Sequence, residues 1–268
     1  MQSIVAGDGS MGRAVAAALA GRGTPALAIL GMPAGPSGHE PEAFAKAELV
    51  FEFSQADAVL PNVRAALAGG VRRIVIGTTA WADDRPEVER LLVEAGAAAV
   101  ASPTFSLGVM LFARLVEEAA RMFSPFPEYD PYLVEWHRRT KVDRPSGTAL
   151  ELSRRIIAAH PRKERVARQL AHGSPDPEEL DVTVIRAGAS PGMHLVGFDA
   201  PGESLELRLT ARDRSAYAAG AVAAAGWLLA AERSPGIHTF DEVVDSMIAA
   251  SAAGTTATAT AAPASQGT

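Results

Sequence analysis

The segment from Glu135 to Ala149 holds the densest group of reactive side chains in the sequence. If residues 133–138 form a strand, Glu135 and His137 point to one face, whereas Val134 and Trp136 point to the other. A carboxylate beside an imidazole can fix the imidazole tautomer and raise its pKa. The pair therefore predicts a proton donor that works near neutral pH.

An anion-binding feature follows this pair directly. The run Pro145-Ser146-Gly147-Thr148 is typical of a helix start, where unpaired backbone amides can bind an anion. Lys141 adds a fixed cation between the imidazole and that helix, and it is one of only three lysines, with Lys46 and Lys163. The combination favours an anionic substrate that must be protonated. The alternative is a solvated edge strand followed by a capped helix, and the clustering of these groups makes that alternative weaker.

A second glycine-rich segment lies at the beginning of the sequence. Gly7-Asp8-Gly9-Ser10-Met11-Gly12 satisfies G-x-G-x-x-G between an apolar run at 2–6 and an expected helix over 11–20. Gly7 would permit the turn, Gly9 would let a pyrophosphate approach the backbone, and Gly12 would allow close helix–strand packing. A glycine-rich strand–helix turn without a ligand is the less favoured alternative.

The sequence lacks the residue that usually binds the adenosine ribose. An acid for NAD, or an arginine for NADP, is expected about 20 residues after the loop, at the end of the second strand. The sequence there is Leu30-Gly31-Met32-Pro33. It therefore supports a dinucleotide, NADH or NADPH, without indicating which.

Alternating strands and helices organise the first part of the chain. Further apolar runs at 26–30, 49–53, 72–77 and 97–101 are separated by helical segments near 56–68 and 84–95, whereas 31–47 has no clear helix. This order predicts an α/β fold, a Rossmann-like parallel sheet covered on both faces.

The pattern changes after residue 106. A helix near 107–123, a strand at 131–138 and a helix from Thr148 to about His160 precede three strand-like runs at 181–187, 192–199 and 203–211. Successive strands predict an α+β substrate and oligomerisation domain with a mixed or antiparallel sheet. We expect a dinucleotide-binding domain of 1–106 and 212–248, with helices at 215–231 and 240–249, a second domain of 107–211, and a disordered tail at 249–268.

Composition excludes several classes of protein. The 25 basic and 31 acidic residues give a net charge of −6, which argues against a nucleic-acid or anionic-membrane binder. With no cysteine there is no disulfide or thiolate metal site, and we expect no metal. The uncharged runs 95–113 and 215–231 are interrupted or rich in Ala and Gly, so we expect buried soluble structure and a cytoplasmic protein.

These motifs together resemble the dihydrodipicolinate reductase family, more fully the 4-hydroxy-tetrahydrodipicolinate reductases. The family signature E-x-H-H-x-x-K-x-D-x-P-S-G-T-A matches at every defined position except the second His, which is Arg138. The resemblance extends over roughly residues 4–230. Its other segments follow in the family order: Gly7 to Gly12, Glu52-Phe53-Ser54, Gly77-Thr78-Thr79-Ala80, Thr104-Phe105-Ser106-Leu107-Gly108-Val109, Arg186-Ala187-Gly188, Gly192, His194, Gly202-Glu203 and Arg214.

The resemblance implies an NAD(P)H-dependent oxidoreductase of lysine and diaminopimelate biosynthesis, usually a homotetramer. It would reduce 4-hydroxy-tetrahydrodipicolinate, a small anionic dicarboxylate, to tetrahydrodipicolinate. His137 would be the proton donor, with Lys141 assisting and binding a carboxylate. The other substrate-binding residues it implies are Arg138, Ser146, Gly147, Thr148 and Arg214. The cofactor-binding residues it implies are Gly7, Asp8, Gly9, Ser10, Met11, Gly12, Phe53, Gly77, Thr78, Thr79, Ser102, Pro103, Thr104 and Phe105.

Departures from the family pattern leave two alternatives open. Arg138 replaces a His that touches substrate in the family, Ala80 and Thr104 replace residues of the cofactor pocket, and Leu209 stands where the family usually has His. One alternative is a reductase of a different cyclic imine or carboxylate. The other, less favoured, is a non-catalytic dinucleotide-binding paralogue.

Overall fold

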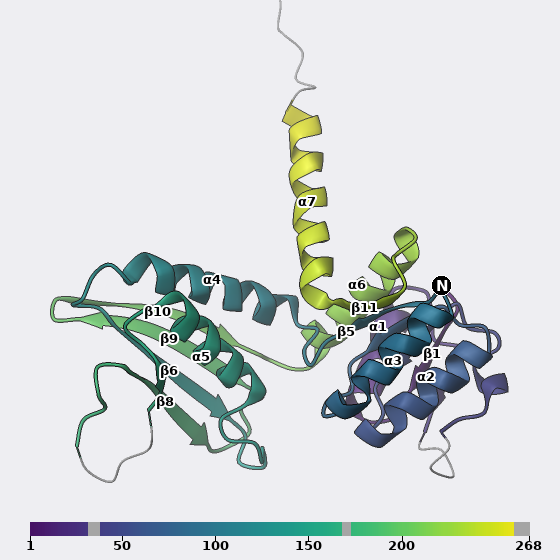
Figure 1. Cartoon of the computed structure of the whole chain (residues 1–268), viewed down its shortest axis with the longest axis horizontal. Helices are drawn as coiled ribbons and strands as arrows, with labels where there is room; N and C mark the ends of the chain where they lie inside the picture. Colours follow the sequence, from purple (N-terminus) through teal and green to yellow (C-terminus); the bar gives the residue numbers. More distant parts are fainter. Residues whose placement is uncertain (32–37, 168–172, 260–268) are drawn as a thin grey trace, which may run out of the picture. The chain divides into compact units, whose positions relative to one another are not determined.

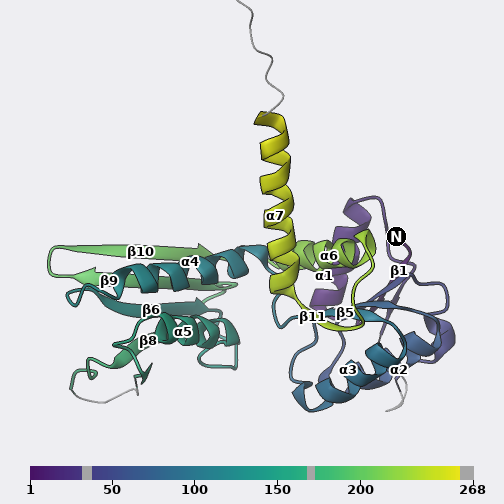
Figure 2. The same cartoon turned by 45° about the horizontal axis from the view of Figure 1, so that its top comes forward.

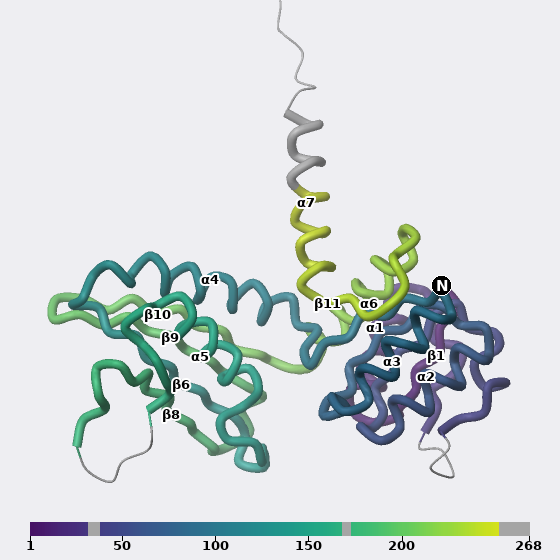
Figure 3. The backbone as a smooth tube through the Cα atoms, viewed as in Figure 1, coloured from purple at the N-terminus to yellow at the C-terminus, as the bar shows by residue number. Residues whose placement is uncertain are grey.

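The structure is a computed structural model that describes residues 1–31, 38–167 and 173–259 (Figure 1). Figure 3 traces the same backbone as a tube. The chain divides into two compact units. Unit 1 comprises Met1–Leu107 and Ser215–Thr268, and unit 2 comprises Gly108–Arg214.

Unit 1 is built on a six-stranded parallel sheet with the order β11-β5-β4-β3-β1-β2 (Figure 1). Its strands, most of them apolar along their whole length, are β1 (Ser3–Ala6), β2 (Ala28–Leu30), β3 (Leu49–Glu52), β4 (Arg73–Ile76), β5 (Ala98–Ala101) and β11 (Gly236–Thr239). The predicted α/β class is confirmed.

Helices cover both faces of this sheet. On one face α2 packs on α3, and on the other α1 packs on α6. The helices of unit 1 are α1 (Ser10–Gly21), α2 (Val59–Ala68), α3 (Arg85–Glu94), α6 (Ser215–Ala230) and α7 (Phe240–Ala259). Because parallel strands end at the same edge, the loops after β1, β3 and β4 lie side by side there, which is where such sheets bind ligands.

Unit 2 contains a mixed five-stranded sheet with the order β10-β9-β6-β8-β7. The strand β6 (Asp130–His137) pairs parallel with β8 (Glu179–Arg186) and antiparallel with β9 (Met193–Ala200), which pairs antiparallel with β10 (Glu203–Thr210). A short strand, β7 (Arg165–Val166), extends the β8 edge.

Two helices cover one face of the mixed sheet. Side chains of α4 (Leu107–Phe123) and α5 (Gly147–Ala159) form a single core with buried residues of the strands (Figure 2). On β6 this is the face of Leu133, Glu135 and His137, which are all buried, whereas Trp136 on the opposite face is 36% exposed. The predicted alternation along this strand is therefore confirmed.

The structure differs from the sequence prediction in three places. Strands β7 and β11 were not predicted, and a 3-10 turn at Pro41–Ala43 lies in the expected loop 31–47, of which 32–37 is outside the described residues. The predicted disordered tail is also wrong in its first half, because α7 continues to Ala259. Alanine has the highest helix propensity, so a helix begun at Phe240 can continue through an alanine-rich segment. The remainder, 260–268, lies outside the described residues. None of the helices in the described part of the chain is long and apolar enough to cross a membrane.

Candidate active site

The glycine loop after β1 makes a turn that only glycine fits. Gly7 has a φ of +112°, and a Cβ on Gly12 would lie 1.8 Å from the Gly7 carbonyl oxygen. Gly9, in contrast, is exposed, and a Cβ there would meet no protein atom within 4 Å. The two outer glycines are thus needed for packing, while Gly9 leaves open space in front of the first turn of α1. An anion could approach the helix amides there.

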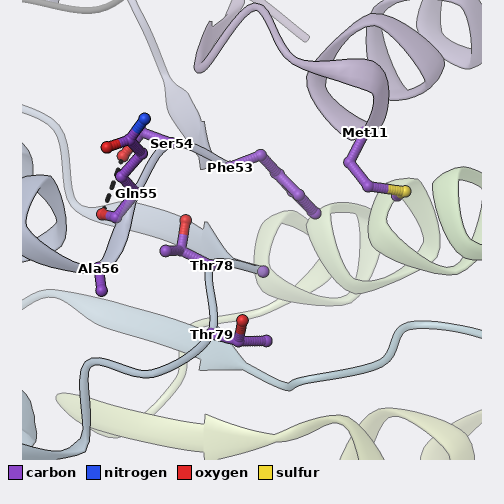
Figure 4. Close-up of a pocket in the computed structure, with 8 residues that line it drawn as sticks. Met11, Phe53, Ser54, Gln55, Ala56, Thr78 and Thr79 are labelled. Atoms are coloured by element: carbon purple, nitrogen blue, oxygen red, sulfur yellow. Dashed lines mark hydrogen bonds between the residues drawn. The ribbon is translucent and has the colours of Figure 1, made fainter. Parts of the chain in front are cut away.

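A pocket of about 340 Å³ lies at the carboxyl ends of β3 and β4 (Figure 4). It is lined by Met11, Phe53, Ser54, Gln55, Ala56, Gly77, Thr78 and Thr79. Five of these residues were predicted to bind a cofactor, and the structure brings them together: Met11, Phe53, Gly77, Thr78 and Thr79. Gly77 is required because a Cβ there would lie 2.1 Å from the Phe53 ring.

Other predicted cofactor residues lie around this pocket rather than in its lining. Asp8 and Ser10 are exposed on the glycine loop. Ser102 and Thr104, with Pro103 between them, form a turn in which the Ser102 hydroxyl donates to the Thr104 carbonyl at 2.5 Å. Phe105 is 2% exposed and packs edge-on against Phe240, 5.1 Å between ring centroids, so its role is in the core.

Ala80 shows why the family pattern has glycine at this position. It adopts a φ of +64°, in the left-handed region that a side chain disfavours. The neighbouring Trp81 holds the turn, because its indole N–H donates to the Thr78 carbonyl at 2.8 Å.

Glu52, at the end of β3, is a completely buried carboxylate beside this pocket. Burial raises its pKa, although hydrogen bonds from Ser54, Thr78 and Asn62 act in the opposite direction. In the sequence, Glu52 is recognisable only as part of the Glu52-Phe53-Ser54 motif, and no role was predicted for it.

In unit 2 a buried carboxylate, Glu135, is the centre of a polar cluster. Its Oε1 accepts from the Arg186 guanidinium at 2.7 Å and from the Ser146 backbone N–H at 3.0 Å. Its Oε2 lies 3.7 Å from Nε2 of His137 and 3.6 Å from Nε2 of His194. Burial alone would raise the pKa of Glu135, but contacts from His194, Ser146 and Arg186 outweigh it and lower the pKa to about 2. Glu135 is therefore ionised at any pH near neutrality.

The surroundings of His137 lower its pKa, whereas the sequence predicts a raised pKa. Burial lowers its pKa, and the charges of His194 and Lys141 add to this effect more than Glu135 opposes it. Its Nδ1 lies 3.1 Å from the Pro191 carbonyl, and Nε2 is buried with no hydrogen-bond partner among the described residues. Burial thus acts against the protonated form of the ring, and both ring nitrogens are enclosed by the protein.

The start of α5 is the place where the sequence predicts an anion site. Ser146 is the N-cap, and its hydroxyl accepts from the Ala149 N–H at 3.1 Å. Because Ser146 also donates its own N–H to Glu135, the first turn of the helix is fixed to β6. Gly147 is exposed and Thr148 is half-buried, so the first amides of the helix remain accessible.

Three predicted cations of the site differ in their surroundings. Lys141, 23% exposed, pairs with Asp143 at 2.6 Å, on the loop between β6 and α5. Arg138 is exposed, with its guanidinium 3.2 Å from the Thr140 hydroxyl. Arg214, the last residue of unit 2, is also exposed. Of the three, Lys141 is held by an ion pair on the loop that leads to α5.

The cluster also contains a donor set that could hold a metal. One ligand atom each from Glu135, His137 and His194 lies within 4.8 Å of the others. Arg186 already neutralises Glu135, however, and a divalent cation would lie beside that guanidinium. We therefore interpret these residues as a proton-transfer and anion-binding cluster.

Comparison with known proteins identifies the family. The family model described as dihydrodipicolinate reductase, C-terminus, matches residues 108–244. A 4-hydroxy-tetrahydrodipicolinate reductase of Methanococcoides burtonii is 35% identical over 75% of this chain and 74% of its own length. The chain belongs to the dihydrodipicolinate reductase family. Another reductase of this name, from Archaeoglobus fulgidus, is 38% identical over 74% of this chain and 76% of its own length.

Solved structures of the family agree on the fold. A dipicolinate-bound dihydrodipicolinate reductase from Paenisporosarcina sp. TG-14 superposes with a TM-score of 0.67 at 17% identity, covering 89% of this chain and 97% of that one. The two-domain α/β fold is therefore that of the family.

Sequence reasoning assigned no role to two members of the cluster, Arg186 and His194. Both belong to family motifs, R-A-G and G-x-H, but they lie about 50 residues after Glu135. Only the pairing of β6 with β8 and β9 brings them to it, with Glu135 opposite His194 in the register. Leu209 lies opposite His194 on β10, so the family's missing His is replaced by an apolar neighbour at this position.

Proposed function

We propose that the chain is an NAD(P)H-dependent reductase that converts 4-hydroxy-tetrahydrodipicolinate to tetrahydrodipicolinate in lysine and diaminopimelate biosynthesis. The observation that carries the proposal is the buried cluster of Glu135, His137, Arg186 and His194 beside Lys141 and the start of α5. Within the dihydrodipicolinate reductase family, this cluster combines a proton-carrying imidazole with two positive binding elements for a dicarboxylate.

The residues of unit 1 fit a nicotinamide dinucleotide. The open space at Gly9 in front of α1 suits a pyrophosphate, and the pocket of Phe53, Thr78 and Thr79 would hold the part of the cofactor beyond it. When bound, the reduced nicotinamide supplies the hydride. The chain offers neither an acid nor an arginine directly after β2, so the proposal includes both NADH and NADPH.

The residues of unit 2 would bind and protonate the substrate. The amides of Gly147 and Thr148 bind one carboxylate, and the Lys141 ammonium binds the other in competition with Asp143. Ser146 and Glu135 keep the helix start in place, and Arg138 and Arg214 add positive potential at the surface. His137 donates the proton, and Lys141 assists.

A second candidate substrate follows from one position. Leu209 lies opposite His194 and removes a polar group from the substrate side of the sheet. Together with Arg138, this favours a related cyclic imine carboxylate as the alternative substrate of the same chemistry.

We further propose that the protein is a homo-oligomer, a tetramer by analogy with the family. In support, the face of the mixed sheet that α4 and α5 leave open carries neighbouring apolar side chains, Trp136 and Ile185, which are 36% and 39% exposed. Light scattering coupled to size exclusion tests the assembly, and a monomer at micromolar concentration would contradict it.

The test of the reaction couples the purified protein to the upstream synthase and follows NADH and NADPH at 340 nm. We expect oxidation of at least one cofactor at a kcat on the order of 1–10³ s⁻¹. Folded protein that oxidises neither would exclude the proposal. Slow turnover of this substrate, together with faster turnover of another cyclic imine, would favour the alternative substrate.

A further inference from the structure

Glu52 is surrounded by hydrogen-bond donors. Its Oε2 accepts from the Thr78 hydroxyl at 2.5 Å, and its Oε1 accepts from the Ser54 hydroxyl, from the Ser54 N–H at 3.3 Å and from the Asn62 amide at 3.2 Å. The carboxylate is completely buried. Burial of a carboxylate costs free energy unless hydrogen bonds or opposite charges compensate for the lost hydration.

Further hydrogen-bonding contacts lead from Glu52 to the end of β2, the edge strand of this sheet. Asn62 Oδ1 lies 2.9 Å from Nδ1 of His39, and Nε2 of His39 lies 3.0 Å from the carbonyl of Gly31, directly after β2. Asn62 also donates to the Ser54 hydroxyl at 3.3 Å. A continuous series of hydrogen-bonding contacts therefore joins the ends of β2, β3 and β4.

The direction of the hydroxyl protons determines the polarity of the pocket. A hydroxyl group has one proton and two lone pairs. Ser54 and Thr78 line the pocket and face it from the ends of neighbouring strands (Figure 4). Each hydroxyl makes its shortest contact with Glu52, whereas the Gln55 carbonyl lies 3.4 Å from the Ser54 hydroxyl. When both hydroxyls donate to the Glu52 carboxylate, oxygen lone pairs remain for a ligand, and one lone pair of Ser54 already accepts from Asn62. The pocket consequently accepts hydrogen bonds at these two positions rather than donating them.

We propose that Glu52 is a positioning residue that makes this pocket an acceptor site for the neutral half of the dinucleotide. Ribose hydroxyls and the nicotinamide carboxamide are hydrogen-bond donors, whereas a phosphate is not. The glycine loop supplies amide donors for phosphate, so the two neighbouring sites have opposite polarity. The inference rests on the proposed function, which supplies the dinucleotide. It assigns the nicotinamide riboside of that dinucleotide to the Ser54 and Thr78 hydroxyls.

A purely structural role for Glu52 makes a different prediction. If Glu52 only held β3 to β4, its replacement would loosen the whole unit and weaken every ligand alike. If it sets the polarity of two hydroxyls, its replacement weakens only ligands that contain the nicotinamide riboside.

The experiment compares NADH with ADP, which lacks the nicotinamide riboside, on the full chain. In Glu52→Gln the new amide N–H donates to a neighbouring hydroxyl, which then turns its proton toward the pocket. We expect the Kd of NADH to rise roughly three- to tenfold, the effect of about one hydrogen bond, with the Kd of ADP unchanged within about twofold. Glu48→Gln, an exposed carboxylate just before β3, is the matched control and should change neither value.

Substitutions of Thr78 test whether Glu52 acts through the hydroxyl. Thr78→Val removes the hydroxyl at nearly constant volume and should weaken NADH by the same factor, whereas Thr78→Ser should restore binding. The double variant Glu52→Gln/Thr78→Val should be no weaker than either single variant, because the two residues act as one unit. If Glu52→Gln does not fold, the contrast between Thr78→Val and Thr78→Ser still tests the acceptor role.

Each result has a defined meaning. Equal weakening of NADH and ADP, additive effects in the double variant, or unchanged NADH binding would overturn the inference. Wild-type protein that binds neither NADH nor NADPH would overturn it together with the proposed function. Selective weakening of NADH in a protein that does not reduce the proposed substrate would support the inference and reject only the substrate assignment.

Discussion

The guanidinium of Arg186 lies 2.7 Å from the carboxylate of Glu135, and both side chains are almost completely buried, with 8% and 0% of their surface exposed. The two residues are 51 positions apart in the sequence, and the parallel pairing of β6 with β8 brings them together. This ion pair fixes the carboxylate that contacts His137, His194 and the start of α5. The geometry of the candidate site therefore depends on the mixed sheet of unit 2.

Replacing Glu135 by Gln should destabilise the protein strongly. The substitution leaves Arg186 buried without its counter-ion, and breaking a buried pair in this way costs roughly 3–5 kcal/mol. Urea unfolding at pH 7 measures the change. Glu151→Gln, which breaks ion pairs with Arg154 and Arg155 on the surface of α5, is the control and should cost less than about 1 kcal/mol.

The stabilisation by Glu135, measured against Glu135→Gln, should depend on pH. The pKa of Glu135 is lowered to about 2 in the folded protein, below its ordinary value of 4.5. The stabilisation is therefore complete above the ordinary value and is lost as the pH falls through about 2. The difference in unfolding free energy between wild type and Glu135→Gln should shrink between pH 5 and pH 2. A difference that stays constant over this range would show that the fold does not lower the pKa of Glu135.

Replacing His137 by Gln should separate chemistry from binding. A general acid contributes on the order of 10²–10⁴ in rate, so kcat should fall by about that factor, while NADH binding in unit 1 stays unchanged. The coupled reductase assay and fluorescence titration with NADH measure the two quantities. His238→Gln in unit 1 is the control, and a wild-type kcat in His137→Gln would exclude the proton-donor role.

Lys141→Met should affect the substrate rather than the cofactor. A hydrogen bond to a charged group is worth roughly 1.5–3 kcal/mol, so kcat/KM for the substrate should fall about 10- to 100-fold with the KM of the cofactor unchanged. The neighbouring exposed Arg139→Met serves as the control for loss of positive charge. An equal effect of both variants would reduce the role of Lys141 to general electrostatic attraction.

The glycine loop offers a matched set of three substitutions. Gly12→Ala should destabilise unit 1, because its Cβ would lie 1.8 Å from the Gly7 carbonyl oxygen. Gly9→Ala meets no protein atom within 4 Å, so it should preserve the melting temperature and weaken dinucleotide binding at least tenfold. Gly21→Ala, at the end of the same helix and equally open, should change neither. Normal NADH affinity in Gly9→Ala would place the pyrophosphate elsewhere.

Local patterns in the sequence predicted the parts of the site that are local in the chain. The glycine loop, the alternation of Glu135 and His137 and the helix start at Ser146 each follow from a few neighbouring residues. The strand order of both sheets and the contribution of Arg186 and His194 depend on pairings across about 50 residues, which periodicity does not encode. The pKa of His137 was predicted in the wrong direction because the neighbouring carboxylate was visible in the sequence and the burial of the ring was not.

The raised pKa of Glu52 gives a final prediction on stability. A carboxyl group whose pKa is higher in the folded than in the unfolded protein contributes stability that is present at low pH and is lost as the pH rises through the folded value. Wild type should therefore lose stability relative to Glu52→Gln as the pH rises above the ordinary carboxyl value of 4.5. Replacement of the hydrogen bonds by Gln adds an offset that does not depend on pH, so the slope of the difference, from urea unfolding at several pH values, is the quantity to measure. Glu48→Gln should give a flat difference, and a flat difference for Glu52→Gln would mean that burial does not perturb this carboxyl group.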